Sequence, residues 1–281
     1  MSWLFFAVLA LACGGTVKKA SPGPDAGPDA GGGAPGNASG GAPGNASGGA
    51  PDSGAPPCLA PRFASAVLAA AVDQALRSSD STLASLTELR VESAGVTSLS
   101  GLECATSLQV LAVSNHQLSD LSPLSGLTKL RQVSLNGGPL QDLAPLRGLP
   151  LSLLSVDDTM VASLEPLRES AALEVVSLNR AQVTDLSPLS TCPKLSELSA
   201  SENPISDVAA VALLPLIRVL ALGKAHISDL TPLLQSTWTG HPELQLQGNP
   251  LSAESLTSVI PELCKRKYYI TADGAGCSPP P

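Results

Sequence analysis

Aromatic side chains are scarce in this chain, since Trp, Tyr and Phe together make up 2% of its 281 residues. Hydrophobic residues still reach 43%, so the core must consist of Leu, Val, Ile and Ala, a composition that suits thin repeated layers. Basic residues are also few, with 16 Lys and Arg against 24 Asp and Glu. The net charge of -8 argues against nucleic acid as a partner, because phosphate binding requires clustered basic side chains.

No hydrophobic run is long enough to cross a bilayer as a helix. Residues 3–12 supply about ten apolar residues where about 20 are needed, so they are predicted to be the apolar part of an export signal. The run ends in Ala10-Leu11-Ala12-Cys13-Gly14, which resembles the lipobox of bacterial lipoproteins, in which the cysteine is diacylated and becomes the mature N-terminus. This resemblance predicts lipid attachment at Cys13. An ordinary cleaved signal and a chance apolar start are the alternatives.

Small and polar residues fill positions 14–57, which are almost wholly Gly, Ala, Pro, Ser, Asp and Asn. Such a segment cannot bury enough apolar surface to offset the entropy of ordering. The sequence Gly-Gly-Ala-Pro-Gly-Asn-Ala-Ser occurs at 32–39 and again at 40–47. We therefore expect a disordered tether. As a flexible coil it would have a root-mean-square end-to-end distance of roughly 35 to 40 Å.

The strongest signal is an internal repeat of about 22 residues. Its units open at Leu86, Leu108, Leu130, Leu151, Leu173, Leu195, Ile217 and His241. With the opening residue counted as position 1, positions 4, 6 and 11 are apolar in every unit. Apolar residues at positions 4 and 6 predict a short strand that points its apolar side inward. Eight such strands, stacked at about 4.8 Å, would form a parallel sheet in which each unit covers its neighbour's apolar face.

The second half of four units carries the pattern Asp-Leu-x-Pro-Leu, beginning at Asp120, Asp142, Asp185 and Asp229. Proline at a fixed offset prevents strand pairing and suits the first position of a short helical turn, which a preceding Ser or Thr can cap. The two leucines then fill the core from the convex side. These aspartates and Asp207 are predicted to cap tight turns, and a column of metal ligands is the alternative.

The Leu-x-x-Leu-x-Leu framework and the Asp-Leu-x-Pro-Leu turn together resemble the 22-residue class of leucine-rich repeats, found in bacterial internalins and in a eukaryotic protein-phosphatase regulator. The resemblance covers about residues 60–272. It implies an α/β fold, a right-handed leucine-rich-repeat solenoid with a short parallel sheet on its concave face. Residues 63–76 resemble the N-terminal helical cap of such proteins, and residues 253–264 with a strand at 268–271 resemble their C-terminal cap.

The predicted parts therefore follow one another along the chain. They are a signal peptide and lipobox at 1–13, the tether at 14–57, a helical cap at 58–85, eight repeats at 86–252 and a C-terminal cap with tail at 253–281. One feature departs from the family. Position 9 usually holds an Asn whose amide bonds neighbouring backbones, but here only Asn203 and Asn249 occupy it, and His116 stands in one of the other units. We expect a lower stability per repeat.

The cysteines of an exported chain usually pair where they can. Cys264 and Cys277 flank the final predicted strand, and Cys58 and Cys104 could pin the helical cap to the first repeat, so both pairs are predicted disulfides. Cys192 falls where another unit has leucine, which predicts a free, buried thiol.

No residue pattern points to catalysis, to a metal or to a cofactor. The histidines His116, His226 and His241 are few and scattered, and a loop or ladder role is favoured for them over catalysis or metal binding. Neither Cys-x-x-Cys nor His-Glu-x-x-His occurs. We expect a protein that is not an enzyme and that needs no cofactor.

The candidate binding surface is the exposed, concave side of the predicted sheet, at positions 3, 5 and 7 of the units, and the candidate residues are taken from positions 5 and 7. Its residues are Arg90, Glu92, Ser134, Asn136, Ser155, Asp157, Ser177, Asn179, Ser199, Ser201, Gln245 and Gln247. The surface is small and polar and lacks aromatic anchors, which predicts a modest interaction or binding elsewhere, around Trp238. Packing of Trp238 against the C-terminal cap is the alternative.

These patterns predict a non-enzymatic, monomeric scaffold that binds a protein ligand. The lipid on Cys13 would hold it at the bacterial cell envelope, in the outer membrane or at the cell surface rather than in the inner membrane. A structural envelope spacer without a specific ligand is the alternative, and an enzyme is the more distant one.

Overall fold

The computed structural model describes residues 58, 61–79, 82–92 and 95–278. The predictions of a signal peptide, of lipid at Cys13 and of a tether fall outside these residues. Among the helices of the described part, none is long and apolar enough to cross a membrane.

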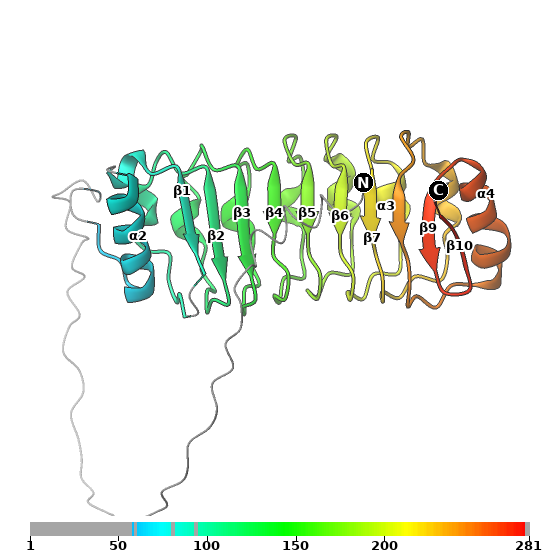
Figure 1. Cartoon of the computed structure of the whole chain (residues 1–281), viewed down its shortest axis with the longest axis horizontal. Helices are drawn as coiled ribbons and strands as arrows, with labels where there is room; N and C mark the ends of the chain where they lie inside the picture. Colours follow the sequence, from blue (N-terminus) through cyan, green and yellow to red (C-terminus); the bar gives the residue numbers. More distant parts are fainter. Residues whose placement is uncertain (1–57, 59–60, 80–81, 93–94, 279–281) are drawn as a thin grey trace, which may run out of the picture. The chain divides into compact units, whose positions relative to one another are not determined.

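A sheet of ten strands runs the length of the described chain, and the strands follow one another in sequence order (Figure 1). Strands β1 to β9 are parallel, and β10 is antiparallel to β9. The strands are β1 Glu88–Val91, β2 Val110–Ser114, β3 Gln132–Asn136, β4 Leu153–Ser155, β5 Val175–Ser177, β6 Glu197–Ser199, β7 Val219–Ala221, β8 Glu243–Gln245, β9 Tyr269–Ala272 and β10 Ala275–Cys277. Strands β1 to β8 confirm the strand predicted for each unit.

The alternation of side chains explains the position of the core. In β2 to β4 the Cα partners Leu111, Val133 and Leu154 stand at position 4 of successive units, and each is 0% exposed. Since the register moves by one whole unit at each step, equivalent residues form columns across the sheet. The apolar columns make one continuous core along the stack.

Short helical turns form the side of the stack opposite the strands. They are η1 Leu83–Ser85, η2 Leu102–Cys104, η3 Ser122–Leu124, η4 Ala144–Leu146, η5 Glu165–Leu167, η6 Ser187–Thr191, α3 Ala209–Ala212 and η7 Thr231–Gln235. In η3 to η7 proline occupies the first turn, as predicted, and the last leucine of each pattern is buried.

The aspartates of these turns are turn caps, as predicted. Each accepts a hydrogen bond from the backbone N–H two residues later, at 2.7 to 2.8 Å, in the case of Asp120, Asp142, Asp185, Asp207 and Asp229. The prediction that the Ser or Thr before the proline caps the turn is wrong. These hydroxyls, on Ser122, Ser187 and Thr231, donate instead to the aspartate carboxylates.

The N-terminal helix α2, Ala66–Ser79, lies beside β1 (Figure 1). It buries Leu68 and Val72 in the common core. The structure pairs Cys58, ahead of this helix, with Cys104 in η2.

The C-terminal end contains η8 Ser255–Val259, a π-helical turn, followed by α4 Ile260–Lys265. Strand β9 lies one residue further along than the predicted 268–271, and β10 was not predicted. A disulfide joins Cys264 to Cys277. Cys192 is free and buried, as predicted, and burial raises the pKa of its thiol.

Trp238 packs against this C-terminal end and is only 5% exposed. Its indole N–H donates to the Leu214 carbonyl at 2.7 Å, and its ring lies 5.6 Å from that of Tyr268. The alternative in which Trp238 packs against the C-terminal cap is therefore confirmed, and the buried Trp238 ring is not available as an anchor for a partner.

Candidate binding face

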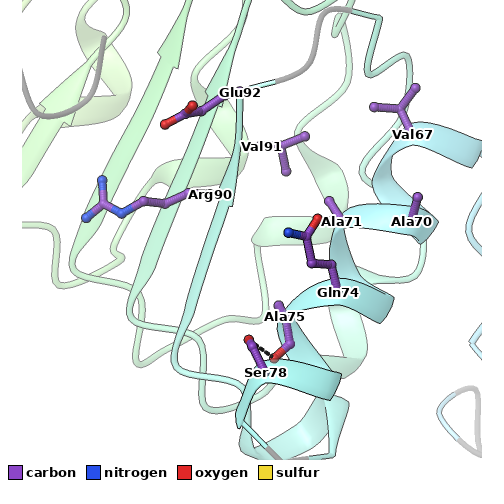
Figure 2. A pocket seen from close by; sticks show the side chains of 9 residues that line it. All are labelled: Val67, Ala70, Ala71, Gln74, Ala75, Ser78, Arg90, Val91 and Glu92. Atoms are coloured by element: carbon purple, nitrogen blue, oxygen red, sulfur yellow. Dashed lines mark hydrogen bonds between the residues drawn. The ribbon is translucent and has the colours of Figure 1, made fainter. Parts of the chain in front are cut away.

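The face of β1 to β8 that points away from the core is called here the strand face. It carries positions 3, 5 and 7 of each unit. Arg90 and Glu92 lie at its first strand, beside a hollow between α2 and β1 (Figure 2). In that view both side chains point away from α2, whereas Val91 points toward it. Arg90 forms an ion pair with Glu88, and all three charged side chains are exposed.

A ladder of hydrogen bonds runs along position 7 from the third unit to the seventh, and the sequence analysis missed it. The Asn136 side-chain oxygen accepts from the Asp157 N–H at 2.8 Å, and Asp157 Oδ1 accepts from the Asn179 N–H at 2.6 Å. The Asn179 oxygen accepts from the Ser201 N–H at 3.0 Å, and Ser201 Oγ accepts from the Gly223 N–H at 3.1 Å. Each position-7 side chain thus satisfies the backbone of the next unit where the strands end. We call these five residues the position-7 ladder.

Two predicted face residues are not exposed. Ser155 and Ser177 are 3% and 1% exposed, so the expectation of a solvent-facing position 5 is wrong at both. The Ser155 hydroxyl donates to Asn136 Oδ1 at 2.9 Å, and the Ser177 hydroxyl donates to Asp157 Oδ1 at 2.8 Å. Both hydroxyls therefore add hydrogen bonds to residues of the position-7 ladder.

The other predicted face residues retain some exposure. Ser134 accepts a hydrogen bond from Asn136 Nδ2 at 3.2 Å, and Ser199 is half-buried. At the eighth strand Gln245 donates to Glu243 at 2.9 Å, and Gln247 is exposed. The predicted residues therefore lie on one face of the sheet.

Asp157 is the only carboxylate of the position-7 ladder, because the ladder's other members are Asn136, Asn179, Ser201 and Gly223. Burial raises the pKa of its carboxyl group, although hydrogen bonds from Ser177 and Asn179 act in the opposite direction. An acid with a raised pKa in the folded state stabilises the fold when protonated, and this stabilisation is lost as the pH rises through the raised pKa. At neutral pH the charge of Asp157 therefore works against folding.

We expect Asp157→Asn to raise the free energy of unfolding at pH 7 relative to the parent, with a smaller difference at pH 4. Asparagine keeps the acceptor for the Asn179 N–H, and its amide can donate to Ser155 in the way that Asn179 Nδ2 donates to Ser177 at 3.1 Å. Urea denaturation at both pH values measures this. Asp157→Ala is the matched control, which should lose roughly 1–3 kcal/mol at both pH values because the ladder breaks. An Asn variant less stable than the parent at pH 7 would contradict the expectation.

Position 8 ends each strand with a left-handed backbone. Its residues from the second unit to the eighth all have positive φ, between 53° and 76°, and they are Asn115, Gly137, Asp158, Arg180, Glu202, Lys224 and Gly248. Side chains from neighbouring units pair here, since Arg180 Nη2 donates to Asp158 at 2.6 Å and Lys224 Nζ to Glu202 at 3.3 Å. These charges border the strand face and, being exposed, add little stability.

The asparagine ladder that the family resemblance predicts at position 9 is present at Asn203 and Asn249. Asn249 Nδ2 donates to the Leu222 carbonyl at 2.7 Å and to the Leu246 carbonyl at 2.9 Å. His116 takes the position in the second unit and is fully buried, with Nδ1 accepting from the Leu118 N–H at 3.1 Å. Burial lowers the pKa of its imidazole, which favours the uncharged form, and its full burial fits a structural role.

His116 also explains a glycine in the next unit. A Cβ at Gly138 would lie 2.4 Å from His116 Nδ1, closer than atoms can pack. Any residue larger than glycine at position 138 would therefore clash with the His116 ring.

The described residues contain no group of three or more His, Cys, Asp or Glu side chains placed to hold a metal ion. His226 and His241 are exposed, and the His241 ring stacks on Tyr269 with centroids 5.9 Å apart.

Comparison with known proteins agrees with this geometry. No protein-family model matches the sequence, and neither does any curated protein sequence. Among solved structures, the chain is similar to an internalin C2 from Listeria monocytogenes, with a TM-score of 0.63 and 27% identity over 75% of this chain and 94% of that one. The fold is a leucine-rich-repeat solenoid.

Two further structures share this fold. A leucine-rich-repeat protein from Leptospira interrogans has a TM-score of 0.59 and 21% identity over 66% of this chain and 48% of that one. A plant peptide hormone receptor has a TM-score of 0.50 and 15% identity over 66% of this chain and 32% of that one. These two structures show the fold alone, and it is the similarity to internalin C2 that makes the solenoid internalin-like.

Proposed function

We propose that this leucine-rich-repeat solenoid is a protein-binding scaffold displayed on the bacterial cell envelope through lipid on Cys13. The observation that carries the proposal is the similarity to internalin C2 over nearly all of that chain, together with a strand face that exposes Arg90, Glu92 and Gln247 among the described residues. The plant receptor of the same fold is described in a complex with its peptide hormone. A sheet braced by the position-7 ladder holds its surface residues rigidly, which reduces the entropy lost on binding.

The display on the envelope is supported by the N-terminal sequence. An apolar run ending in Ala10-Leu11-Ala12-Cys13 followed by a tether of small residues would place the solenoid clear of a membrane. The proposed protein acts as a monomer without a cofactor, and a chemical reaction is not part of its role.

Chemical crosslinking of the protein on intact cells, followed by affinity capture, tests both parts of the proposal. We expect the parent chain to partition with membranes and to capture a specific envelope or host protein. Cys13→Ser should move the chain to the soluble fraction while its purified solenoid still captures that protein. A chain that stays with membranes after this substitution would contradict the lipid anchor. If no protein is captured above the level of a control that lacks the solenoid, the proposed scaffold function is contradicted.

A structural spacer without a ligand is the second candidate. It is favoured by one observation, namely that the ladder residues on the strand face hydrogen-bond mainly to one another. Charge changes at exposed face residues distinguish the two functions. Glu92→Lys and Gln247→Lys would leave the phenotype of a spacer unchanged and would weaken the phenotype of a scaffold.

A further inference from the structure

A second line of side chains crosses the strand face beside the position-7 ladder. It consists of Cα partners in five successive strands, β5 to β9, and we call it the carboxylate row. Its members are Val175, Glu197, Val219, Glu243 and Tyr269, and all five are half-buried. Apolar and acidic side chains alternate along the row, and an aromatic ring ends it.

Glu197 lies in this row without a partner. It is placed between Val175 and Val219, and within the described residues no hydrogen bond or ion pair involves its side-chain carboxylate. Burial raises the pKa of its carboxyl group, and Arg218, acting from a distance, lowers it only in part. A half-buried carboxylate that has lost water and gained no donor is a position that a cation from another molecule can satisfy.

The other acidic residue of the row is Glu243, which accepts one hydrogen bond, from Gln245 Nε2 at 2.9 Å. Beyond it, the Tyr269 ring is braced by its stack on His241, at 5.9 Å between centroids. A rigid, partly exposed tyrosine is a common anchor of protein interfaces. The row therefore offers two carboxylates and apolar contacts to the same partner.

The spacing of the row selects the partner's backbone. Adjacent strands lie about 4.8 Å apart, so Glu197 and Glu243 are separated by roughly 10 Å, with Val219 midway. On an α-helix, residues i and i+7 are about 10.5 Å apart on one face, with i+3 and i+4 between them. An extended peptide repeats its side chains on one face every 6.6 to 6.8 Å or so, out of step with the row.

We propose that the carboxylate row binds an amphipathic basic helix of a partner protein. In this arrangement Lys or Arg at i and i+7 faces Glu197 and Glu243, and an aliphatic residue at i+3 or i+4 packs on Val219. The helix lies along the length of the solenoid. This inference rests on the proposed scaffold function and names the chemistry of its partner.

The surface next to the row permits a helix to approach. Positions 5 and 7 of the sixth and seventh units are Ser199, Ser201, Ala221 and Gly223, all small. The net charge of -8 favours a cationic partner as well, because it attracts such a partner before contact.

Two synthetic peptides of about 20 residues test the proposal against the whole protein by isothermal titration calorimetry. Both are helical and have the same composition. The first carries Lys at i and i+7 with Leu at i+3 and i+4, and the second carries its lysines on the opposite helix face. We expect the first to bind at least about tenfold more tightly, with an affinity that falls as salt is raised. Equal binding of the two peptides overturns the proposal.

Substitutions of the row provide the second arm. The double substitution Glu197→Gln with Glu243→Gln keeps the shape of both side chains. It should weaken the binding of the first peptide on the order of tenfold or more. Glu254→Gln, at an exposed acid outside the row, is the matched control and should change nothing. An unchanged affinity in the double variant, folded by circular dichroism, overturns the proposal.

The same double variant separates this proposal from the scaffold function. A cellular partner captured equally by the parent and by the double variant would overturn the row as the site and leave the scaffold intact. If no cellular protein is captured while the first peptide still binds selectively through the row, the scaffold function alone is contradicted.

Discussion

Asn203→Ala is expected to lower the free energy of unfolding by roughly 2–5 kcal/mol, since each buried polar group left without a partner costs about 1–3 kcal/mol. Asn203 is 2% exposed, and its Nδ2 donates to the Leu178 carbonyl at 2.8 Å and to the Ala200 carbonyl at 3.0 Å. Its Oδ1 accepts from the Val183 N–H at 3.0 Å. Alanine removes these hydrogen bonds and a fourth, from Nδ2 to the Ser201 carbonyl at 3.2 Å, and two of the four cross between units.

Urea denaturation followed by circular dichroism measures this loss. Gln182→Ala is the control, because this exposed residue directly precedes Val183, and it should change stability by less than about 0.5 kcal/mol. The effect should also be local at first, so hydrogen exchange should accelerate in β5 and β6 before it does so in β2. A loss below about 1 kcal/mol would show that the asparagine ladder contributes little in this solenoid.

Loss of the disulfide between Cys58 and Cys104 is expected to lower the free energy of unfolding by up to about 4 kcal/mol. This figure follows from the model in which a crosslink stabilises the fold by restricting the unfolded chain. The sequence separation of 46 residues sets this figure, and the bridge closes a loop that contains α2 and β1. We expect Cys58→Ala with Cys104→Ala to release α2 from the first unit, and to expose its buried residues Leu68 and Val72.

Hydrogen exchange across α2 and β1 measures the release, and peptide mapping of the parent under non-reducing conditions checks the pairing itself. Cys264→Ala with Cys277→Ala is the matched comparison, because its shorter separation of 13 residues predicts about 3 kcal/mol and a change at the other end of the sheet. Exchange in α2 that is unaffected by loss of its bridge would mean that helix packing alone holds this end.

The repeat unit is predictable because its signals are local. Leu89 and Val91 alternate within a few residues, and Asp120 and Pro123 mark a turn within one unit, so period and turn chemistry locate strands and turns without knowledge of the fold. The C-terminal end is less predictable. Strand β10 pairs with β9 only because the chain reverses after β9, and the residues of β10, Ala275–Cys277, have no alternating pattern of their own.

The strand face shows the limits of the sequence more clearly. The columns of equivalent residues on this face follow from the repeat period. The exposure of each column, however, depends on the size of the side chains beside it. Ser155 and Ser199 share position 5, yet the first is buried and hydrogen-bonded to Asn136, and the second remains half-exposed. The position-7 ladder has no motif, because Asn, Asp and Ser serve it equally well.

The sequence by itself determined the thin aliphatic core, the unit of about 22 residues, the short parallel strands and the capped turns, since each arises from contacts inside one unit or from one unit repeating the next. The tertiary structure alone decided which polar side chains meet, and therefore the position-7 ladder, the charge pairs of position 8 and the unpartnered Glu197. The physical reason is that these side chains stand about 22 residues apart in the chain and about 4.8 Å apart in the stack. Their chemistry emerges only when one unit is laid on the next.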